Sequence, residues 1–317
     1  MKRKMFLGVL ILTGLVLVAG CSFKVSKYIP SKNPFQNLFK TKAKTVVEKT
    51  YNKQKKQPDK SIEEVSLKVN RLIEQTVDQI NKGDIASAIK TGEQAYTITT
   101  DEPAFKKVSA SVYTVSSVKE KLYETLVEAY DYKNHIDGLS KDEKVKYGRV
   151  ARAHFNINPT DPFKKHALAR VLIETGNLTE GVKLATEVYN SKDKNKDAID
   201  TYGWGLYLNG KRKEAYDVYK TFWNQSETLV QMYHSAVVLE EYDKALGMII
   251  YKGCESVANN LMVNKGNINN LSAQSYLNKI SGDSKKAADR LLIGGTGVDA
   301  QFKSDALAGL IQAIAKL

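Results

Sequence analysis

Residues 199–222 carry the clearest sign of the chain's architecture and read Ile199-Asp-Thr-Tyr-Gly203-Trp-Gly-Leu206-Tyr-Leu-Asn-Gly210-Lys-Arg-Lys-Glu-Ala215-Tyr-Asp-Val-Tyr219-Lys-Thr-Phe222. Gly210 suits the left-handed conformation that ends many helices. A second amphipathic stretch follows it, because Ala215, Tyr219 and Phe222 recur at helical spacing. Ala215 is small enough to let two antiparallel helices approach closely. The segment therefore predicts a helix, a tight turn and a second helix.

The same arrangement recurs along the chain, with a glycine followed five residues later by a small residue. The pairs are Gly83 and Ala88, Gly176 and Gly181, Gly210 and Ala215, and Gly282 and Ala287. Gly176 and Gly210 lie 34 residues apart. Fixed spacing of this kind indicates a repeat protein in which each helix pair buries its apolar stripe against its neighbours. Residues 61–317 are thus predicted to form one all-α domain, whose first helix starts at a capping box of Ser61 and Glu64. Ser140 and Glu143 have the same spacing and predict the cap of another helix.

This pattern resembles the tetratricopeptide repeat family. Gly203, Gly210, Ala215 and Tyr219 match its signature small and aromatic positions, and residues 170–188 and 241–246 give weaker copies. The family's early tryptophan is missing, since Trp204 stands one residue past the small position. The resemblance implies a solenoid of antiparallel helix pairs wound into a right-handed superhelix. Residues 103–118, which are rich in Ser and Val, are compatible with a strand or a loop.

The N-terminus predicts export and lipid attachment. Basic residues at positions 2–4 precede an apolar run that ends in Leu17-Val18-Ala19-Gly20-Cys21, which resembles the lipobox of bacterial lipoproteins. This resemblance implies a signal peptide over residues 1–20, cleavage before Cys21 and acylation of Cys21, with palmitate as one of the acyl chains. An ordinary signal peptide or an uncleaved anchor is the alternative. The expected location is the exported side of the cell membrane or the outer membrane, without a preference between them.

Residues 21–60 are predicted to be a flexible, disordered tether with a strong positive charge. Eleven lysines between residues 22 and 60 face only Glu48 and Asp59, so most of the chain's net charge of +13 lies there. One hypothesis is that this strip lies on anionic lipid or cell-wall polymer, and the other is that it is a self-repelling spacer. The lysines assigned to the surface contact are Lys24, Lys27, Lys32, Lys40, Lys42, Lys44, Lys53, Lys55 and Lys56.

The predicted domain offers little that indicates chemistry. It is close to neutral in net charge, which argues against a nucleic-acid partner. Two cysteines are too few for a fold of this size to depend on disulfide bonds. The four histidines form no ligand motif and are expected on the surface or in a groove, and Cys254 is expected to be buried and structural. The glycine cluster at 294–297 lacks the end of a phosphate loop and is interpreted as a linker to a final helix at 306–317. We therefore expect no enzyme activity, no cofactor and no metal.

These observations favour a membrane-anchored lipoprotein whose repeat domain binds a protein partner in a cell-envelope assembly or secretion complex. The alternative is a ligand-binding accessory lipoprotein of a transporter, and the oligomeric state is left open. In tetratricopeptide arrays the position after the signature small residue points into the concave face. That rule and its neighbouring positions give the candidate partner-binding residues His166, Arg170, Trp204, Tyr207, His234 and Tyr276. For Trp204, packing between repeats is the competing interpretation.

Overall fold

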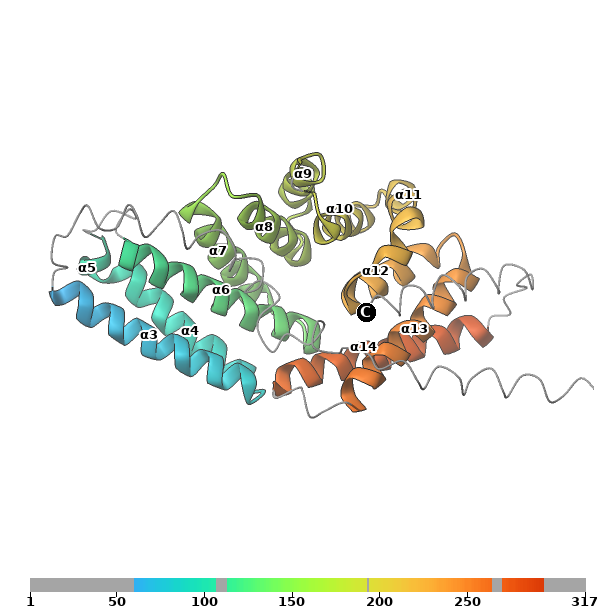
Figure 1. Ribbon diagram of the computed structural model, residues 1–317. Coiled ribbons are helices and arrows are strands. Elements are labelled where there is room, and N and C mark those ends of the chain that lie inside the picture. The colour runs from blue at the N-terminus through green and yellow to red at the C-terminus, as the bar shows by residue number, and fades with distance from the viewer. Residues whose placement is uncertain (1–59, 107–112, 193, 264–269, 294–317) are drawn as a thin grey trace, which may run out of the picture.

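The computed structural model describes residues 60–106, 113–192, 194–263 and 270–293, and within these ranges the regular structure is entirely helical. Successive helices pack against one another in chain order (Figure 1). Their bounds are α3 Lys60–Asn81, α4 Ile85–Asp101, α5 Pro103–Lys106, α6 Tyr113–Ile136, α7 Lys141–Ile157, α8 Pro162–Thr175, α9 Leu178–Tyr189, α10 Lys196–Leu208, α11 Arg212–Phe222, α12 Leu229–Leu239, α13 Lys244–Val263 and α14 Leu271–Ile293, with a short 3-10 helix at Trp223–Gln225. The prediction of an all-α fold is confirmed for this part of the chain.

Glycine turns separate the helices where the pattern placed them. Gly83, Gly176 and Gly210 have φ angles of 78°, 92° and 79°, which L side chains adopt only with strain. The capping box predicted at Ser140 and Glu143 is present at the start of α7. Each turn thus reverses the chain so that the second helix packs along the first.

The small residue after each turn lies where two helices meet. Ala88 and Ala215 are completely buried, and Gly181 of α9 faces Ile173 of α8. A Cβ atom on Gly181 would stand 2.8 Å from Ile173 Cγ1 and 2.9 Å from the Ile173 backbone nitrogen. These helices therefore approach more closely than any residue larger than glycine permits at position 181.

The last described helix, α14, packs against α3 and α6, so the row of helices curves round and closes on itself (Figure 1). We call this curved assembly the arch. Near its start, α14 donates a hydrogen bond from Ser272 Oγ to the carbonyl oxygen of Ile80 at the end of α3. Further along, Tyr276 meets His135 of α6 edge to face, with ring centroids 5.1 Å apart. The arch places the inward sides of α6, α8, α10, α12 and α14 near one another.

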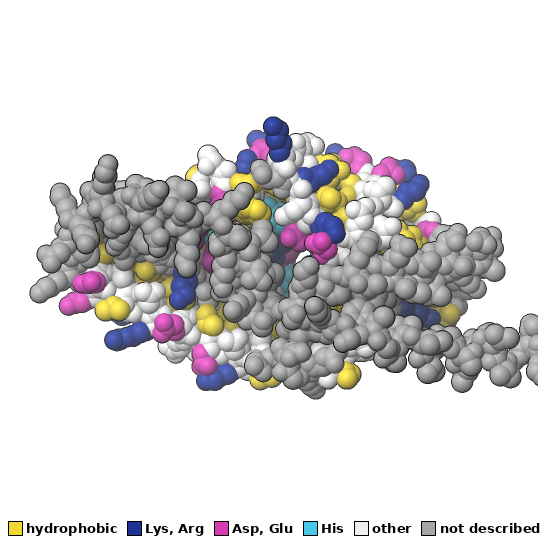
Figure 2. All heavy atoms as spheres, viewed as in Figure 1, with side chains coloured by type: hydrophobic (Ala, Val, Ile, Leu, Met, Phe, Trp, Pro, Cys, Tyr) yellow, Lys and Arg dark blue, Asp and Glu magenta, His cyan; other side chains and the backbone are white. Residues whose placement is uncertain are grey.

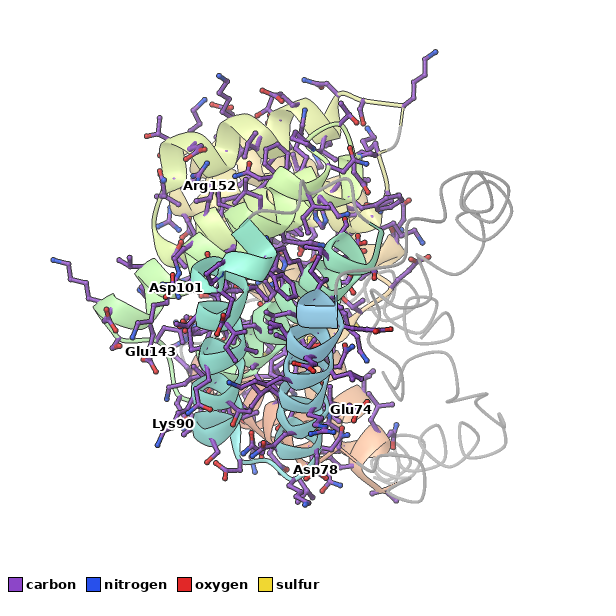
Figure 3. All side chains as sticks on the ribbon, turned by 90° about the vertical axis from the view of Figure 1, so that its left-hand side faces the viewer. Glu74, Asp78, Lys90, Asp101, Glu143 and Arg152 are labelled. Atoms are coloured by element: carbon purple, nitrogen blue, oxygen red, sulfur yellow. The ribbon has the colours of Figure 1, made fainter. Side chains whose placement is uncertain are left out.

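Charged side chains cover the outer side of α3 and α4. Figure 3 shows Glu74 and Asp78 on α3 and Lys90 on α4, and all three are exposed. The buried side of α3 repeats at helical spacing through Val69 and Ile73 and packs on α4 and α6. Among the described helices, none has the length and apolar character that crossing a membrane requires.

Three local predictions were wrong. Gly282 does not end a helix, because α14 runs without interruption through it. The start of α3 at Lys60 puts Ser61 inside the first turn instead of at the cap. The described part of 103–118 is helical, since α5 covers 103–106 and α6 begins at Tyr113.

Several predictions fall outside the described residues. These are the signal peptide, Cys21, the nine surface lysines, the linker at 294–297 and the helix at 306–317.

Candidate functional site

The predicted partner-binding residues lie on consecutive inward-facing helices. His166 and Arg170 come from α8, Trp204 and Tyr207 from α10, His234 from α12 and Tyr276 from α14. We call the surface that these helices share with α6 the inner face. Figure 2 shows histidine side chains at the centre of the view, with acidic side chains beside them.

Arg170 of α8 forms hydrogen bonds with α6. Its guanidinium donates two hydrogen bonds to the carboxylate of Asp131, both 2.7 Å long, and a third of 3.1 Å to Glu174. Tyr147 of α7 also donates its hydroxyl hydrogen to Asp131. Burial opposes the charge of Arg170, but Asp131, Tyr147 and Glu174 outweigh it and hold the pKa of Arg170 well above its ordinary value. The guanidinium is therefore a fixed positive charge with a set orientation.

Trp204 and His234 form a flat aromatic stack between α10 and α12. Their ring centroids lie 4.1 Å apart at an interplanar angle of 6°. The ring of Tyr207 also stacks with Trp204, at a centroid distance of 5.2 Å. Tyr207 also donates a hydrogen bond to Glu241 and lies under the guanidinium of Arg212. The half-buried indole offers an apolar edge and is held in place by its neighbours.

A buried carboxylate fixes the histidine of this stack. Asp200 is 7% exposed, and its Oδ2 lies 3.0 Å from His234 Nδ1. Tyr219 of α11 donates its hydroxyl hydrogen to Asp200 Oδ1 over 2.7 Å. An ionised Asp200 requires the proton of neutral His234 to sit on Nδ1, which leaves Nε2 as the acceptor.

His166 does not offer a binding surface. The side chain is buried between α8 and α10, where Nε2 lies 2.9 Å from Thr201 Oγ1. Burial, aided by the nearby charge of Arg170, lowers its pKa to about 4. His154 is also buried, so two of the four histidines depart from the expected surface or groove position. Each imidazole faces a neighbouring helix, since His154 lies 3.8 Å from Glu124 of α6 and His166 contacts Thr201 of α10.

An acidic stripe along α6 forms the opposite side of the inner face and was missed from the sequence. It consists of Glu120, Glu124, Glu128 and Asp131, whose spacing places them on one side of the helix. Burial raises the pKa of Glu124 to about 7, with Glu120 adding to the effect. Burial and the charges of Asp131 and Glu124 raise the pKa of Glu128 to about 7. The spacing of the acids already predicted that they share one side of a helix. Only the packing of α6 in the structure shows that this side faces the inner face and not solvent.

Two groups of described residues have carboxylate and imidazole atoms close enough to hold a metal ion. In the group of Asp131, His135 and Glu174, the guanidinium of Arg170 already bonds both carboxylates, and His135 Nδ1 lies 2.8 Å from the Asp131 carbonyl oxygen. A cation there would have to displace Arg170. The second group comprises Glu120, Glu124 and His154.

Two further features lie outside the inner face. Cys254 is a free cysteine, fully buried, and burial raises the pKa of its thiol, which makes it a poor nucleophile. An open groove between α4, α7 and α8 is lined by Tyr96, Arg149 and Arg152. Arg149 pairs with Glu93 and Arg152 with Glu180, so both cations of this groove already have partners.

The inner face thus combines aromatic side chains, a row of carboxylates of which two have raised pKa values, and the guanidinium of Arg170. Such a surface can recognise a polypeptide through aromatic contacts and charge-assisted hydrogen bonds. No protein-family model matches the chain, and no curated protein matches its sequence.

Proposed function

We propose that this protein is a lipid-anchored lipoprotein with a tetratricopeptide-like solenoid that binds a protein partner of a cell-envelope assembly or secretion complex through its inner face. The observation that carries the proposal is the gathering of Arg170, Trp204, His234 and Tyr276 on helices that share one side of the arch. Arg and aromatic side chains supply much of the binding energy in protein recognition.

Contacts between equivalent positions of successive helix pairs support the tetratricopeptide assignment. His234 binds Asp200 from 34 residues earlier, and Gln231 donates to Asp197 across the same separation. His166 meets Thr201 at a separation of 35 residues. A regular repeat brings each residue next to its counterpart one period away, so a period near 34 residues accounts for these contacts.

The lipid anchor rests on the order of basic, apolar and small residues before Cys21. Acyl chains on Cys21 would hold the domain at a membrane without a spanning helix, and several chains bind far more firmly than one. The segment between Cys21 and α3 then sets the distance over which the domain can search for its partner.

The charge of the inner face narrows the class of partner. The acidic stripe, Glu174 and Asp200 outnumber the cations Lys164 and Arg170. We therefore expect the bound segment to carry lysine or arginine, because electrostatic complementarity selects partners and orients them.

Site-specific photo-crosslinking in the native membrane tests this proposal. p-Benzoylphenylalanine replaces Tyr207 or Tyr276 on the inner face. The control position is Tyr216 of α11, a tyrosine on the second helix of the pair that contacts Tyr242. The proposal expects both inner positions to capture the same protein and the control position to miss it. Trp204→Ala should weaken that capture. If the inner positions yield no adduct, or if all three positions yield the same one, the inner face is not the binding surface.

A further inference from the structure

Three side chains of the types that bind metal ions lie close together where α6 meets α7, apart from the aromatic stack of the inner face. Glu120 and Glu124 stand four residues apart on α6 and therefore project from the same side of the helix. His154 approaches them from the last turn of α7. One ligand atom from each of the three residues lies within 4.8 Å of the others.

His154 is the observation that points to a ligand. Its side chain is only 7% exposed, and its Nε2 atom finds no hydrogen-bond partner among the described residues. The nearest carboxylate oxygen, Glu124 Oε1, lies 3.8 Å away, which is too far for a hydrogen bond. A buried imidazole nitrogen without a partner is costly, so a group that fills the space between Nε2 and the carboxylates would be stabilising.

Lys164 accounts for only part of the negative charge. The Lys164 side chain is 5% exposed, and its ammonium group bonds Glu120, so it neutralises one of the two carboxylates. Glu124 is left as the acid that faces His154. The other metal-like group differs, because there the guanidinium of Arg170 bonds both carboxylates.

We propose that Glu120, Glu124 and His154 bind a divalent metal ion of the zinc class. One imidazole with two carboxylates is a ligand set that zinc accepts, whereas magnesium and calcium prefer oxygen ligands alone. Three protein ligands leave one coordination position for water or for a partner's side chain. The side chains of Glu120 and Glu124 are 35% and 24% exposed, so an ion can reach them from solvent. The bound ion would clamp α6 to α7 and stiffen one wall of the inner face.

The test measures zinc binding to the full chain in detergent, with Cys21→Ser to remove a competing thiol. After chelator treatment and equilibrium dialysis, the protein should hold about one Zn²⁺ per chain. Glu124→Gln and His154→Gln should each weaken binding by more than about tenfold, since even outer-shell partners contribute that much. His135→Gln, in the group filled by Arg170, is the matched control and should leave the affinity unchanged.

Lys164→Met gives a second readout that misfolding cannot imitate. Removing the positive charge beside Glu120 should tighten zinc binding by roughly tenfold, because the ammonium group repels the ion. Circular dichroism spectra confirm that each variant is folded. The inference is overturned if zinc does not bind saturably, if Glu124→Gln and His154→Gln bind as well as the parent, or if His135→Gln weakens binding as much as they do.

Discussion

Replacing Gly181 with alanine tests whether close helix approach builds the repeat. Gly181 lies in α9, five residues past the αL glycine Gly176, and faces Ile173 of α8. The new Cβ atom would stand 2.8 Å from Ile173 Cγ1, 2.9 Å from the Ile173 backbone nitrogen and 3.1 Å from Leu172 Cβ. Rotating the Ile173 side chain cannot relieve the contact with its own backbone, so the two helices must separate.

The magnitude follows from two opposing effects. Alanine is favoured over glycine inside a helix by about 1 kcal/mol. Overpacking a close contact costs about 1–3 kcal/mol, and a contact with backbone belongs at the upper end of that range. The net loss in the free energy of unfolding should be about 2 kcal/mol. For a domain of this size that corresponds to a fall in melting temperature of roughly 4–8 °C.

Gly148→Ala is the matched control, because Gly148 also lies inside a helix. A Cβ atom there would meet nothing within 4 Å, so only the helix preference of alanine acts. This variant should gain about 1 kcal/mol, or roughly 2–4 °C. Calorimetric melts of both variants decide the matter. If Gly181→Ala is as stable as the parent, or if both variants shift in the same direction, close packing at position 181 is not what holds α8 and α9 together.

Four further predictions address titration, anchoring and binding. Because the pKa of His166 is lowered to about 4, below the value near 6.5 of the unfolded chain, stability should fall as pH drops from about 6.5 to about 4, and His166→Gln should flatten that part of the melting-temperature profile. Cys21→Ala should abolish acylation, and an intact mass that retains residues 1–20 in the parent protein would exclude the lipobox. Unlipidated protein should bind anionic vesicles at low salt and detach when the Debye length shortens to about 8 Å, whereas equal binding to neutral vesicles would leave only the spacer hypothesis. Trp204→Ala should weaken partner capture by about 2 kcal/mol with little change in melting temperature, and a loss of stability near 3 kcal/mol would assign the indole to packing between repeats.

The parts of the fold that sequence predicted are those with local causes. A helix that ends at Gly83, Gly176 or Gly210 does so because the backbone conformation there suits glycine. The capping box at Ser140 is equally local, since its two hydrogen bonds join residues three apart. Burial of Cys254 followed from its apolar neighbours.

The parts that sequence missed depend on contacts between distant segments. Gly282 has a turn-forming residue type, yet α14 continues through it because Ile280, Ala288 and Leu291 pack against α13 along the whole helix. That packing outweighs the roughly 1 kcal/mol that glycine costs inside a helix. The same holds for the candidate site. Its residues on α8, α10, α12 and α14 were predicted from their positions relative to the repeat motif. The acidic stripe of α6 was not predicted, because its place on the inner face depends on contacts between distant helices.

The partly buried acids of the inner face determine which ligands it attracts. In water, neighbouring carboxylates repel one another only weakly and stay ionised. The packing of α14 on α3 and α6 brings Tyr276 near Asp131 and Arg170. Burial and the charges of neighbouring acids raise the pKa values of Glu124 and Glu128 to about 7. These carboxylates are therefore less stable as anions than they would be in water, and a cation that enters the inner face recovers that energy. The two proposed ligands therefore have the same physical basis. A basic side chain of a partner and a divalent ion at Glu124 would each stabilise the ionised carboxylates of α6.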